Sequence, residues 1–545
     1  MVRVNPSAPA HVGRNLAELI EARAQARGDA PFLVWDEGQG AEPESVERWS
    51  YAEWASAVRR LAAVLGARGI RRGDRVCVHL DNRPEFLLAW WALARLGAVC
   101  VSTNARSAPD ELRFYLEDSG ACALVTSAAR RAVVAEAVPD AVEYVVLVDA
   151  DAEAIPGPQR RTEWLADLLA EGASASDVPA SLAESSDPCC ILYTSGTTSR
   201  PKGVVLTHAN YLWGAGQMAI HQRLAADDVY LVQMPLFHVN AQIYSVLASW
   251  VAGGSVVLVP RFSRSRFFDV ANAHRATASS MIPFYVMALL RHPDGSRIAV
   301  DDLRRHSFRR WGYGITSPKL DHRFQLKTIG WYGMTETISA AIIAPWDVPV
   351  PEGAIGRPAP GYQIQLVDDE GIPVPPGIPG ALSVRGVRGV TLAREYWNRP
   401  RATAAAFDRD GWFATGDRMR YDADGWLYFV DREKDMLKVG GENVASSEIE
   451  RVIQEVPGVL EVAVVGLADG LLDEVPAACV IPAPGLDAAE LCERILGHAR
   501  AKLADFKVPR RIELVSSLPR VTLEKVNKAA LRELLAAPEP AVATS

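Results

Sequence analysis

Short apolar runs alternate with segments of helical spacing over most of the chain. Residues 75–80, RVCVHL, form an apolar run of strand length, and residues 84–98, PEFLLAWWALARLGA, follow with helical spacing. Strands separated by helices predict parallel sheets that are covered on both faces. Further strands of this αβ region are expected at 98–103, 122–127, 228–234 and 255–260, with helices at 110–120 and near 241–251.

The pattern changes after about residue 345. Short strands such as YQIQLVDD (362–369) and GALSVRG (380–386) alternate with the turn-rich GIPVPPGIPG (371–380), which is typical of a small β-unit. Another section follows, with strands expected at 462–468 and 477–482 and a helix at 487–503. Its length of about 110 residues is normal for a small domain.

The fold class that these patterns predict is α/β. We expect a large N-terminal domain at 1–433, in which two parallel-rich αβ subdomains extend to about residue 345 and a small β-unit occupies about 353–433. A small α+β C-terminal domain is expected at 434–545. Its boundary is expected at Arg432–Asp435, and a disordered tail at its last residues, AAPEPAVATS.

Composition and charge exclude several classes of protein. The chain has 545 residues, of which 49% are apolar and 23% are charged, as in ordinary globular proteins. The net charge of −8, without a run of Lys or Arg, argues against nucleic-acid binding. No apolar run approaches the ~20 residues of a membrane span. The start lacks the apolar segment of a signal peptide, and the seven cysteines form no CxxC pair. We therefore expect a cytoplasmic protein with Cys189 and Cys190 buried in a strand.

The loop TSGTTSRPKGV at 194–204 packs five hydroxyl side chains, two glycines and one lysine together. Gly196 and Gly203 free the backbone, so that successive N–H groups can surround one anion. Lys202 adds a positive charge, and hydroxyl donors come from Thr194, Ser195, Thr197, Thr198 and Ser199. The strand CCILY leads into the loop, and Thr207 is expected to cap a helix after it. This strand–loop–helix context predicts a phosphate site rather than a solvent-exposed turn.

The order of residues differs from the common P-loop, in which Lys directly follows the second Gly. Instead, YTSGTTSRPKGVVLTHAN (193–210) resembles the phosphate loop of the AMP-forming acyl-CoA synthetase, adenylation-domain and luciferase superfamily, with Ser199 where Gly is usual. YGMTET (332–337) is similar to a second motif of this superfamily. The resemblance implies that Tyr332 packs on adenine beside Gly333, that Thr335 contacts the α-phosphate, and that Glu336 helps to hold Mg²⁺ with Thr194. A carboxylate beside phosphates is costly unless a cation lies between them.

Two further segments complete the implied nucleotide site. WFATGD (412–417) is similar to the segment whose Asp accepts hydrogen bonds from both ribose hydroxyls, which implies this role for Asp417. Arg432, in DREKDMLKVGGENV, is implied to contact ribose or phosphate. WGYGITSP takes the place of the superfamily's GGAP pattern, where Gly312 and Gly314 would allow the nucleotide to approach the backbone.

The acid pocket is also implied by the resemblance. MPLFHVNA (234–241) is similar to the segment that lines the acyl pocket, which places His238 in the substrate-facing wall. In acetate-specific relatives a bulky aromatic residue closes the pocket floor at the position of Gly333. We therefore expect Gly333 to leave the floor open for an acid larger than acetate. Apolar or aromatic walls are expected from Phe237, Phe284 and Tyr285.

The C-terminal domain is implied to supply a lysine and to be mobile. LPRVTLEKVNK (518–528) resembles the superfamily's PRTxxGK motif and places Lys525 at the catalytic lysine, which binds the carboxylate and the α-phosphate. Val521 and Glu524 depart from the motif, and Lys528 is the less favoured alternative. This domain reorients between half-reactions in the superfamily, about a hinge that matches Lys434. The segment KVGGEN would then face the active site with Lys438, Gly440 and Gly441.

The resemblance covers roughly residues 15–535 and implies an ATP-dependent carboxylic acid–CoA ligase. Its first half-reaction joins the carboxylate to AMP with Mg·ATP and releases pyrophosphate, and its second transfers the acyl group to coenzyme A. Two alternatives stay open: an enzyme that delivers its acyl-adenylate to a carrier protein or another enzyme, and a nucleotide-binding regulator without catalysis. The presence of Lys202, Glu336, Asp417, Arg432 and Lys525 argues against the regulator. The identity of the acid and a homodimeric assembly are left open.

Overall fold

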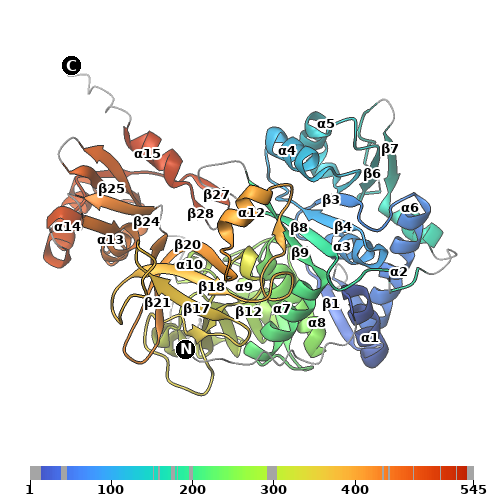
Figure 1. Cartoon of the computed structure of the whole chain (residues 1–545), viewed down its shortest axis with the longest axis horizontal. Helices are drawn as coiled ribbons and strands as arrows, with labels where there is room; N and C mark the ends of the chain where they lie inside the picture. Colours follow the sequence, from blue (N-terminus) through green and yellow to red (C-terminus); the bar gives the residue numbers. More distant parts are fainter. Residues whose placement is uncertain are drawn as a thin grey trace.

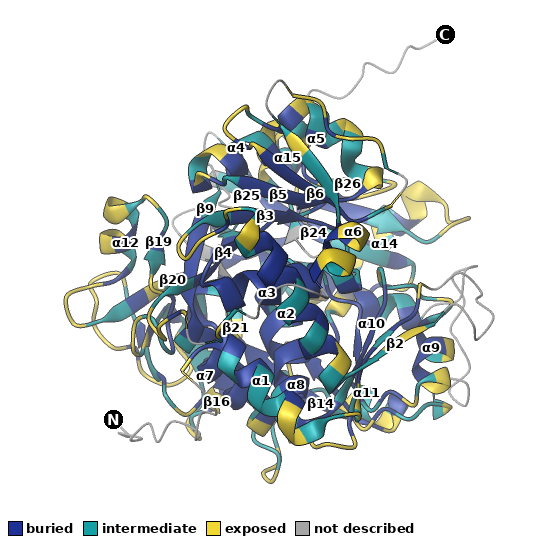
Figure 2. Ribbon diagram, turned by 90° about the vertical axis from the view of Figure 1, so that its right-hand side faces the viewer, coloured by how far each residue is buried: buried dark blue, intermediate teal, exposed yellow. Residues whose placement is uncertain are grey.

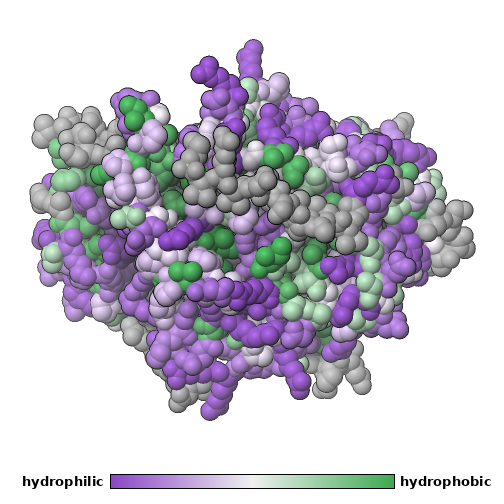
Figure 3. Space-filling view, turned by 60° about the horizontal axis from the view of Figure 1, so that its bottom comes forward, coloured by the Kyte–Doolittle hydropathy of each residue, from purple (hydrophilic) through white to green (hydrophobic). Residues whose placement is uncertain are grey.

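A large body holds most of the chain, and a smaller C-terminal section from about residue 436 lies at its side (Figure 1, orange to red). The face seen in Figure 3 is mostly hydrophilic, with hydrophobic side chains in small scattered groups. Within the described residues, none of the helices is both long and apolar enough to cross a membrane. This computed structural model describes residues 14–37, 46–150, 152–157, 160–172, 178–180, 182–194, 201–290, 304–432, 435–439, 442–469, 472–503, 505–522 and 525–536.

Two mostly parallel sheets form the large body. The first has, from edge to edge, the strands β19 Glu395–Tyr396, β9 Lys202–Thr207, β8 Pro188–Thr194, β4 Val99–Ser102, β3 Arg75–His79, β5 Ala123–Thr126, β6 Tyr144–Leu147 and β7 Arg161–Trp164. The second has β16 Arg357–Pro358, β15 Ile342–Ile343, β14 Lys327–Tyr332, β13 Arg310–Tyr313, β12 Ala278–Ser280, β10 Val229–Val232, β11 Ser255–Leu258, β1 Pro31–Trp35 and β2 Glu47–Ser50. The predicted alternation of strands and helices is confirmed.

Helices cover these sheets. Nearly every residue of one of them, α3, Pro84–Leu96, is buried. A helix that is apolar all round must be covered on all sides, and Figure 2 shows α3 dark blue in the interior. Its Trp91 belongs to a buried aromatic group with Phe32, Trp54 and Trp250. The other helices of this body are α1 Leu16–Arg27, α2 Tyr51–Ala67, α4 Pro109–Ser119, α5 Arg131–Ala137, α6 Leu165–Glu171, α7 His208–His221, α8 Ala248–Ala252, α9 Phe267–Ala273, α10 Pro283–Leu289, α11 Pro318–Phe324 and α12 Pro400–Ala406.

One predicted connection is wrong. The phosphate loop does not run from a strand directly into a helix, because β9 follows it and pairs antiparallel with β8. Only after β9 does Thr207 cap α7, where its hydroxyl accepts the backbone N–H of Asn210 over 3.1 Å. The apolar residues Val204–Leu206 are buried as a strand between β8 and β19. The loop therefore connects the two strands of a hairpin, and β9 separates it along the chain from α7.

The helix expected near 241–251 has an unusual first half. Asn240–Leu247 is a π-helix, η4, and α8 continues from it. Gly214 of α7 faces this segment, and an added methyl group there would lie 2.8 Å from Ile243. The missing side chain therefore lets η4 pack closely against α7.

The predicted β-unit and C-terminal section are also present. The β-unit contains β17 Gln363–Val367, β18 Gly380–Arg385, β20 Trp412–Tyr421 and β21 Leu427–Arg432, which pair antiparallel in this order. In the C-terminal section one sheet holds β22 Met436–Val439, β23 Glu442–Ala445, β24 Val459–Asp469, β25 Asp473–Pro482 and β26 Arg511–Leu514; a hairpin is formed by β27 Arg520–Thr522 and β28 Lys525–Val526. Its helices are α13 Ser446–Gln454, α14 Ala488–Lys502 and α15 Lys528–Ala536. The boundary at Arg432–Asp435 stays a prediction.

Candidate active site

The predicted phosphate loop connects β8 to β9. Ser195, Gly196, Thr197, Thr198 and Ser199 lie outside the described residues and stay predictions. At the base of the hairpin Thr194 pairs with Lys202, and the Thr194 hydroxyl donates to the Lys202 carbonyl over 3.4 Å. The two ends of the loop therefore lie side by side.

Lys202 and Glu336 meet at a residue that no quoted motif identifies, Tyr396. The Lys202 ammonium lies 4.9 Å from the centre of the Tyr396 ring, and the Tyr396 hydroxyl donates to Glu336 Oε1 over 2.8 Å. Glu336 is buried in the 3-10 turn η6, Thr335–Thr337. Burial, followed by the charge of Glu336 and this hydrogen bond, raises the pKa of Tyr396, so its hydroxyl stays a donor.

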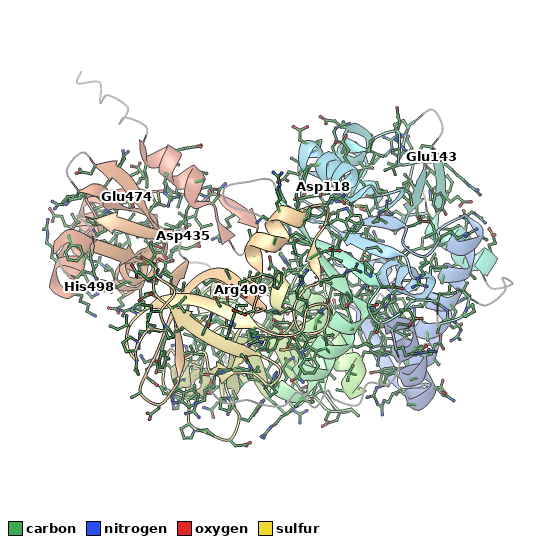
Figure 4. The ribbon with its side chains drawn as sticks, in the orientation of Figure 1. Asp118, Glu143, Arg409, Asp435, Glu474 and His498 are labelled. Carbon is green, nitrogen blue, oxygen red and sulfur yellow. The ribbon has the colours of Figure 1, made fainter. Side chains whose placement is uncertain are left out.

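Strand pairing explains how Tyr396 arrives there. β19 pairs antiparallel with β9, which places Tyr396 opposite Val204. The residues after Tyr396 donate hydrogen bonds to Asp118 of α4. Figure 4 labels Asp118. The Asp118 carbonyl accepts from Trp397 Nε1 over 3.1 Å, and its carboxylate accepts from Arg399 and, over 2.9 Å, from the Tyr193 hydroxyl. Three distant parts of the chain, represented by Asp118, Tyr193 with Lys202, and Tyr396 with Trp397, thus come together here.

Tyr332 and Asp417 form a second buried cluster. Tyr332 ends β14, four residues before Glu336, and its hydroxyl donates to Asp417 Oδ2 over 2.6 Å. Asp417 lies on β20 opposite Arg432 of β21, whose side chain is outside the described part. Thr335 is half-buried in the short segment between the clusters. The structure thus brings together Tyr332, Glu336 and Asp417, while their contacts with a nucleotide stay predictions.

The donor set is compatible with the predicted Mg²⁺. Among the described residues, no group of three or more His, Cys, Asp or Glu side chains could hold a metal ion. Mg²⁺ is usually bound by one or two carboxylates together with substrate phosphates, so a single buried carboxylate beside a phosphate loop is a suitable protein contribution. Glu336 and Thr194 are the residues that would hold it.

A cavity of about 510 Å³ lies beside the carboxyl end of β10. Its walls include Phe237, His238 and Tyr285, and the ring of His238 lies 4.2 Å from that of Phe237. Burial lowers the pKa of His238 to about 4, so the imidazole is neutral at neutral pH. His238 can offer a hydrogen bond to a substrate but no charge. The side chain of Phe284 is outside the described part of the chain.

Two of the glycines that the motifs singled out lie against aromatic side chains. At Gly312 a side chain would collide with the Trp331 ring, so this glycine admits an indole, whereas Gly314 has no neighbour within 4 Å of an added methyl group. At Gly333 a side chain would collide with the Tyr244 hydroxyl. The Tyr244 hydroxyl of η4 thus occupies the space into which a side chain at position 333 would extend, and the open floor of the acid pocket stays a prediction.

The C-terminal hairpin reaches the large body. Arg520, the first residue of β27, and Asn527, which follows β28, line the same cavity as His238. Lys525 lies between them in the sequence, on β28. The described part of the structure does not include the side chains of Lys525, Arg432 and Lys438. It also leaves out the residues Lys434, Gly440, Gly441 and Glu524.

The competing lysine, Lys528, is already engaged within the fold. Its ammonium lies 3.0 Å from Glu450 Oε1 and donates to Ser446 Oγ over 2.5 Å. Ser446 in turn donates to Asp431 Oδ2 over 2.8 Å. These contacts favour Lys525 over Lys528 as the lysine that serves substrate.

The comparisons with known proteins agree with this geometry. A family model described as AMP-binding enzyme matches residues 20–397, and one described as AMP-binding enzyme C-terminal domain matches residues 448–525. The crotonobetaine/carnitine–CoA ligase of Escherichia coli O17:K52:H18 (strain UMN026 / ExPEC) is 34% identical over 517 residues, which cover 93% of this chain and 97% of that protein.

Solved structures give the same result. An anthranilate CoA ligase, AuaEII, in complex with anthranoyl-AMP has a TM-score of 0.83 at 25% identity and covers 96% of this chain and 98% of its own. ATP-bound MatB from Rhodopseudomonas palustris has a TM-score of 0.80 at 29% identity. The match covers 95% of this chain and 99% of the MatB chain. The prediction of an AMP-forming acyl-CoA ligase is confirmed at this level. The chain therefore belongs to the AMP-binding enzyme family.

Proposed function

We propose that this chain adenylates a carboxylic acid larger than acetate and then transfers the acyl group to coenzyme A. One observation carries the proposal: the segment 332–336 joins two clusters, the buried pair Tyr332–Asp417 and the group Glu336–Tyr396–Lys202, in which the lysine is half-buried. A carboxylate suits the two hydroxyls of a ribose, and an ammonium beside a hydroxyl-rich loop suits a polyphosphate. The clusters therefore match the two ends of one nucleotide.

In the first half-reaction a carboxylate oxygen attacks the α-phosphorus of ATP, and the bond to pyrophosphate breaks. Negative oxygens approach one another in this step, so fixed donors and positive charge lower the barrier. We assign Lys202 and its loop to the pyrophosphate, Thr335 to the α-phosphate, and Lys525 to the carboxylate and the α-phosphate. Mg²⁺, held by Glu336 and Thr194, would neutralise phosphate charge.

In the second half-reaction the thiol sulfur of coenzyme A attacks the acyl carbonyl, and AMP leaves with the electron pair of the broken bond. A thiol with a pKa of ~8.5 is partly ionised near neutral pH, so a neutral His238 is sufficient and no strong base is needed. We place the route of the thiol in the cavity at His238. Arg106 and Arg261 line this cavity, and their guanidinium groups suit the phosphates of coenzyme A. Arg520 lines it too, but its guanidinium is paired with Glu461.

The test is ATP–pyrophosphate exchange against a panel of acids, followed by thioester formation with and without coenzyme A. The panel should contain acetate, straight-chain and hydroxylated C4–C6 acids, benzoate, anthranilate and crotonobetaine. Exchange with a C4-or-larger acid above acetate, followed by an acyl-CoA product, supports the proposal. Exchange without an acyl-CoA product would favour delivery to a carrier protein, and preference for acetate would contradict the proposed substrate size.

A further inference from the structure

The π-helix η4 carries a tyrosine into the site. It begins two residues after His238, and π-helical turns are rare and frequently lie at functional sites. Tyr244, in its middle, lies with its ring 5.4 Å from that of Trp331, edge to face, and its hydroxyl lies against Gly333. Gly333 itself is exposed, and it directly follows Tyr332 of the nucleotide cluster. The Tyr244 hydroxyl is therefore close to the point where the acid would meet the nucleotide.

The hydroxyl of Tyr244 differs from those of neighbouring buried tyrosines. Tyr230 bonds to Gln222 and Ser280, each over 2.9 Å, and Tyr211 donates to Gln242 over 2.6 Å. Tyr244 is only 3% exposed, and no hydrogen bond joins its hydroxyl to another of the described residues. The hydroxyl is not one of the fully enclosed polar atoms that lack a partner in the described part of the chain, so its oxygen reaches open space. A bound molecule in that space can accept a hydrogen bond from it.

We propose that the Tyr244 hydroxyl is the polar floor of the acid pocket, and that the preferred substrate is a short carboxylic acid with an oxygen acceptor, a hydroxyl or carbonyl, away from its carboxylate. The inference rests on the proposed function and names its substrate class. Burial raises the pKa of Tyr244, so the hydroxyl is protonated and can donate. Trp331 and Tyr244 together limit the length of the acid, because they fill the spaces beside Gly312 and Gly333.

Matched acids of equal length separate this hydrogen bond from simple size. Pyrophosphate exchange is measured with 3-hydroxybutanoate against 3-methylbutanoate, 4-hydroxybutanoate against pentanoate, and 5-hydroxypentanoate against hexanoate. In each pair a methyl group replaces the hydroxyl. We expect the wild type to prefer the hydroxy acid in at least one pair. Tyr244→Phe should reduce that preference about tenfold through a higher KM for the hydroxy acid, since it removes one hydrogen bond.

Tyr230→Phe is the matched control, because it removes a buried hydroxyl that is used inside the fold. We expect it to lower the melting temperature and to leave every acid ratio unchanged, whereas Tyr244→Phe should melt at or above the wild-type temperature. Equal acid ratios in the wild type and Tyr244→Phe would overturn the inference while the ligase function stands. If no acid of the full panel supports exchange in the wild type, the proposed function itself fails.

Discussion

The nucleotide side and the lysine side of the proposed site are built differently. On the nucleotide side Glu336 and Asp417 are buried, and each accepts a hydrogen bond from a tyrosine that belongs to another strand or segment. On the lysine side Lys525 lies on β28, a strand of two residues in a hairpin. The small domain that carries it is held to the end of β21 by the contacts of Asp431 with Ser446 and Ser447.

This difference suits the two tasks of an adenylating ligase. Groups that bind the nucleotide throughout both half-reactions gain from being fixed before the substrate arrives, because no reorganisation is then needed. A lysine that neutralises charge only in the first half-reaction gains from lying on an element that can leave. The predictions below test this contrast, beginning with the residue whose loss should cost most.

Lys525→Ala should slow adenylation by about 10²–10³-fold, the scale for removing one preorganised electrostatic donor. Thioester formation from supplied acyl-adenylate should stay within a few-fold of the wild type, because the bond that the lysine helps to form already exists. The two rates are measured separately, by pyrophosphate exchange and by conversion of synthetic acyl-adenylate. Lys528→Ala is the comparison variant, and it should not show this loss of adenylation. Equal slowing of both half-reactions by Lys525→Ala would contradict the contrast.

Tyr396 tests the nucleotide side. Tyr396→Phe keeps the ring beside Lys202 but removes the hydrogen bond to Glu336. We expect about a tenfold higher Mg²⁺ requirement for adenylation, because hydrogen bonds to charged groups are worth about 1.5–3 kcal/mol. Tyr396→Leu also removes the ring and should further raise the KM for ATP. Stabilisation of the folded protein by Mg·ATP in thermal unfolding gives a readout that is independent of turnover.

The control for Tyr396 is Tyr428→Phe, which removes a comparable hydroxyl–carboxylate contact, Tyr428 to Asp422 over 2.9 Å, in the β-unit. It should change neither the Mg²⁺ requirement nor the KM for ATP. An unchanged Mg²⁺ requirement in Tyr396→Phe would mean that Glu336 does not depend on this tyrosine for its position.

Much of this site could be predicted from the sequence because its motifs resemble those of a known superfamily and occur in the same order. Tyr332 in YGMTET, at the end of β14, and Asp417 in WFATGD, within β20, are such cases. Tyr396 was not predictable in this way, because its role arises from the pairing of β19 with β9 across about 190 residues of chain. The same pairing explains the missed strand: VVLT (204–207) could be read as the approach to a helix until β19 and β8 were seen to bind its two edges.

Tyr244 shows a second limit. If 241–251 were a regular α-helix, the direction of the Tyr244 side chain would follow from a period of about 3.6 residues. The π-helix has a wider turn, which alters which side chains face the sheet. Gly333 alone therefore gave an incomplete account of the pocket floor. Space at a glycine can be filled from a different element, and only the packed structure shows which one.

The contacts between the two domains should have a smaller effect than either cluster. Ser446→Ala removes the hydrogen bond to Asp431 and the acceptor of Lys528. If the small domain turns about Lys434, this contact must break between half-reactions, so weakening it should slow adenylation and speed thioester formation, each by about threefold, as expected for one ordinary hydrogen bond. Lys507→Ala is the control, because its partner Glu448 lies 2.7 Å away within the same domain. Parallel changes in both rates would argue against a role in reorientation.

Substitution of His238 should have the smallest effect, and the pH dependence of adenylation is the measurement that checks it. Burial lowers the pKa of His238 from 6.5 to about 4. Between these values the unfolded chain binds a proton that the folded chain does not, so this contribution to stability is fully present above about pH 6.5 and is lost as the pH falls towards 4. Adenylation should not show a titration of His238 between about pH 6 and pH 8, because the imidazole is neutral throughout this range. His238→Gln, which keeps a polar side chain of similar size, should therefore change the height of the profile without moving its midpoints. A wild-type midpoint near pH 6.5 that disappears in His238→Gln would show that the histidine is solvated and charged during catalysis. His238 would then be grouped with the lysine side of the site, which can move, rather than with the fixed nucleotide side.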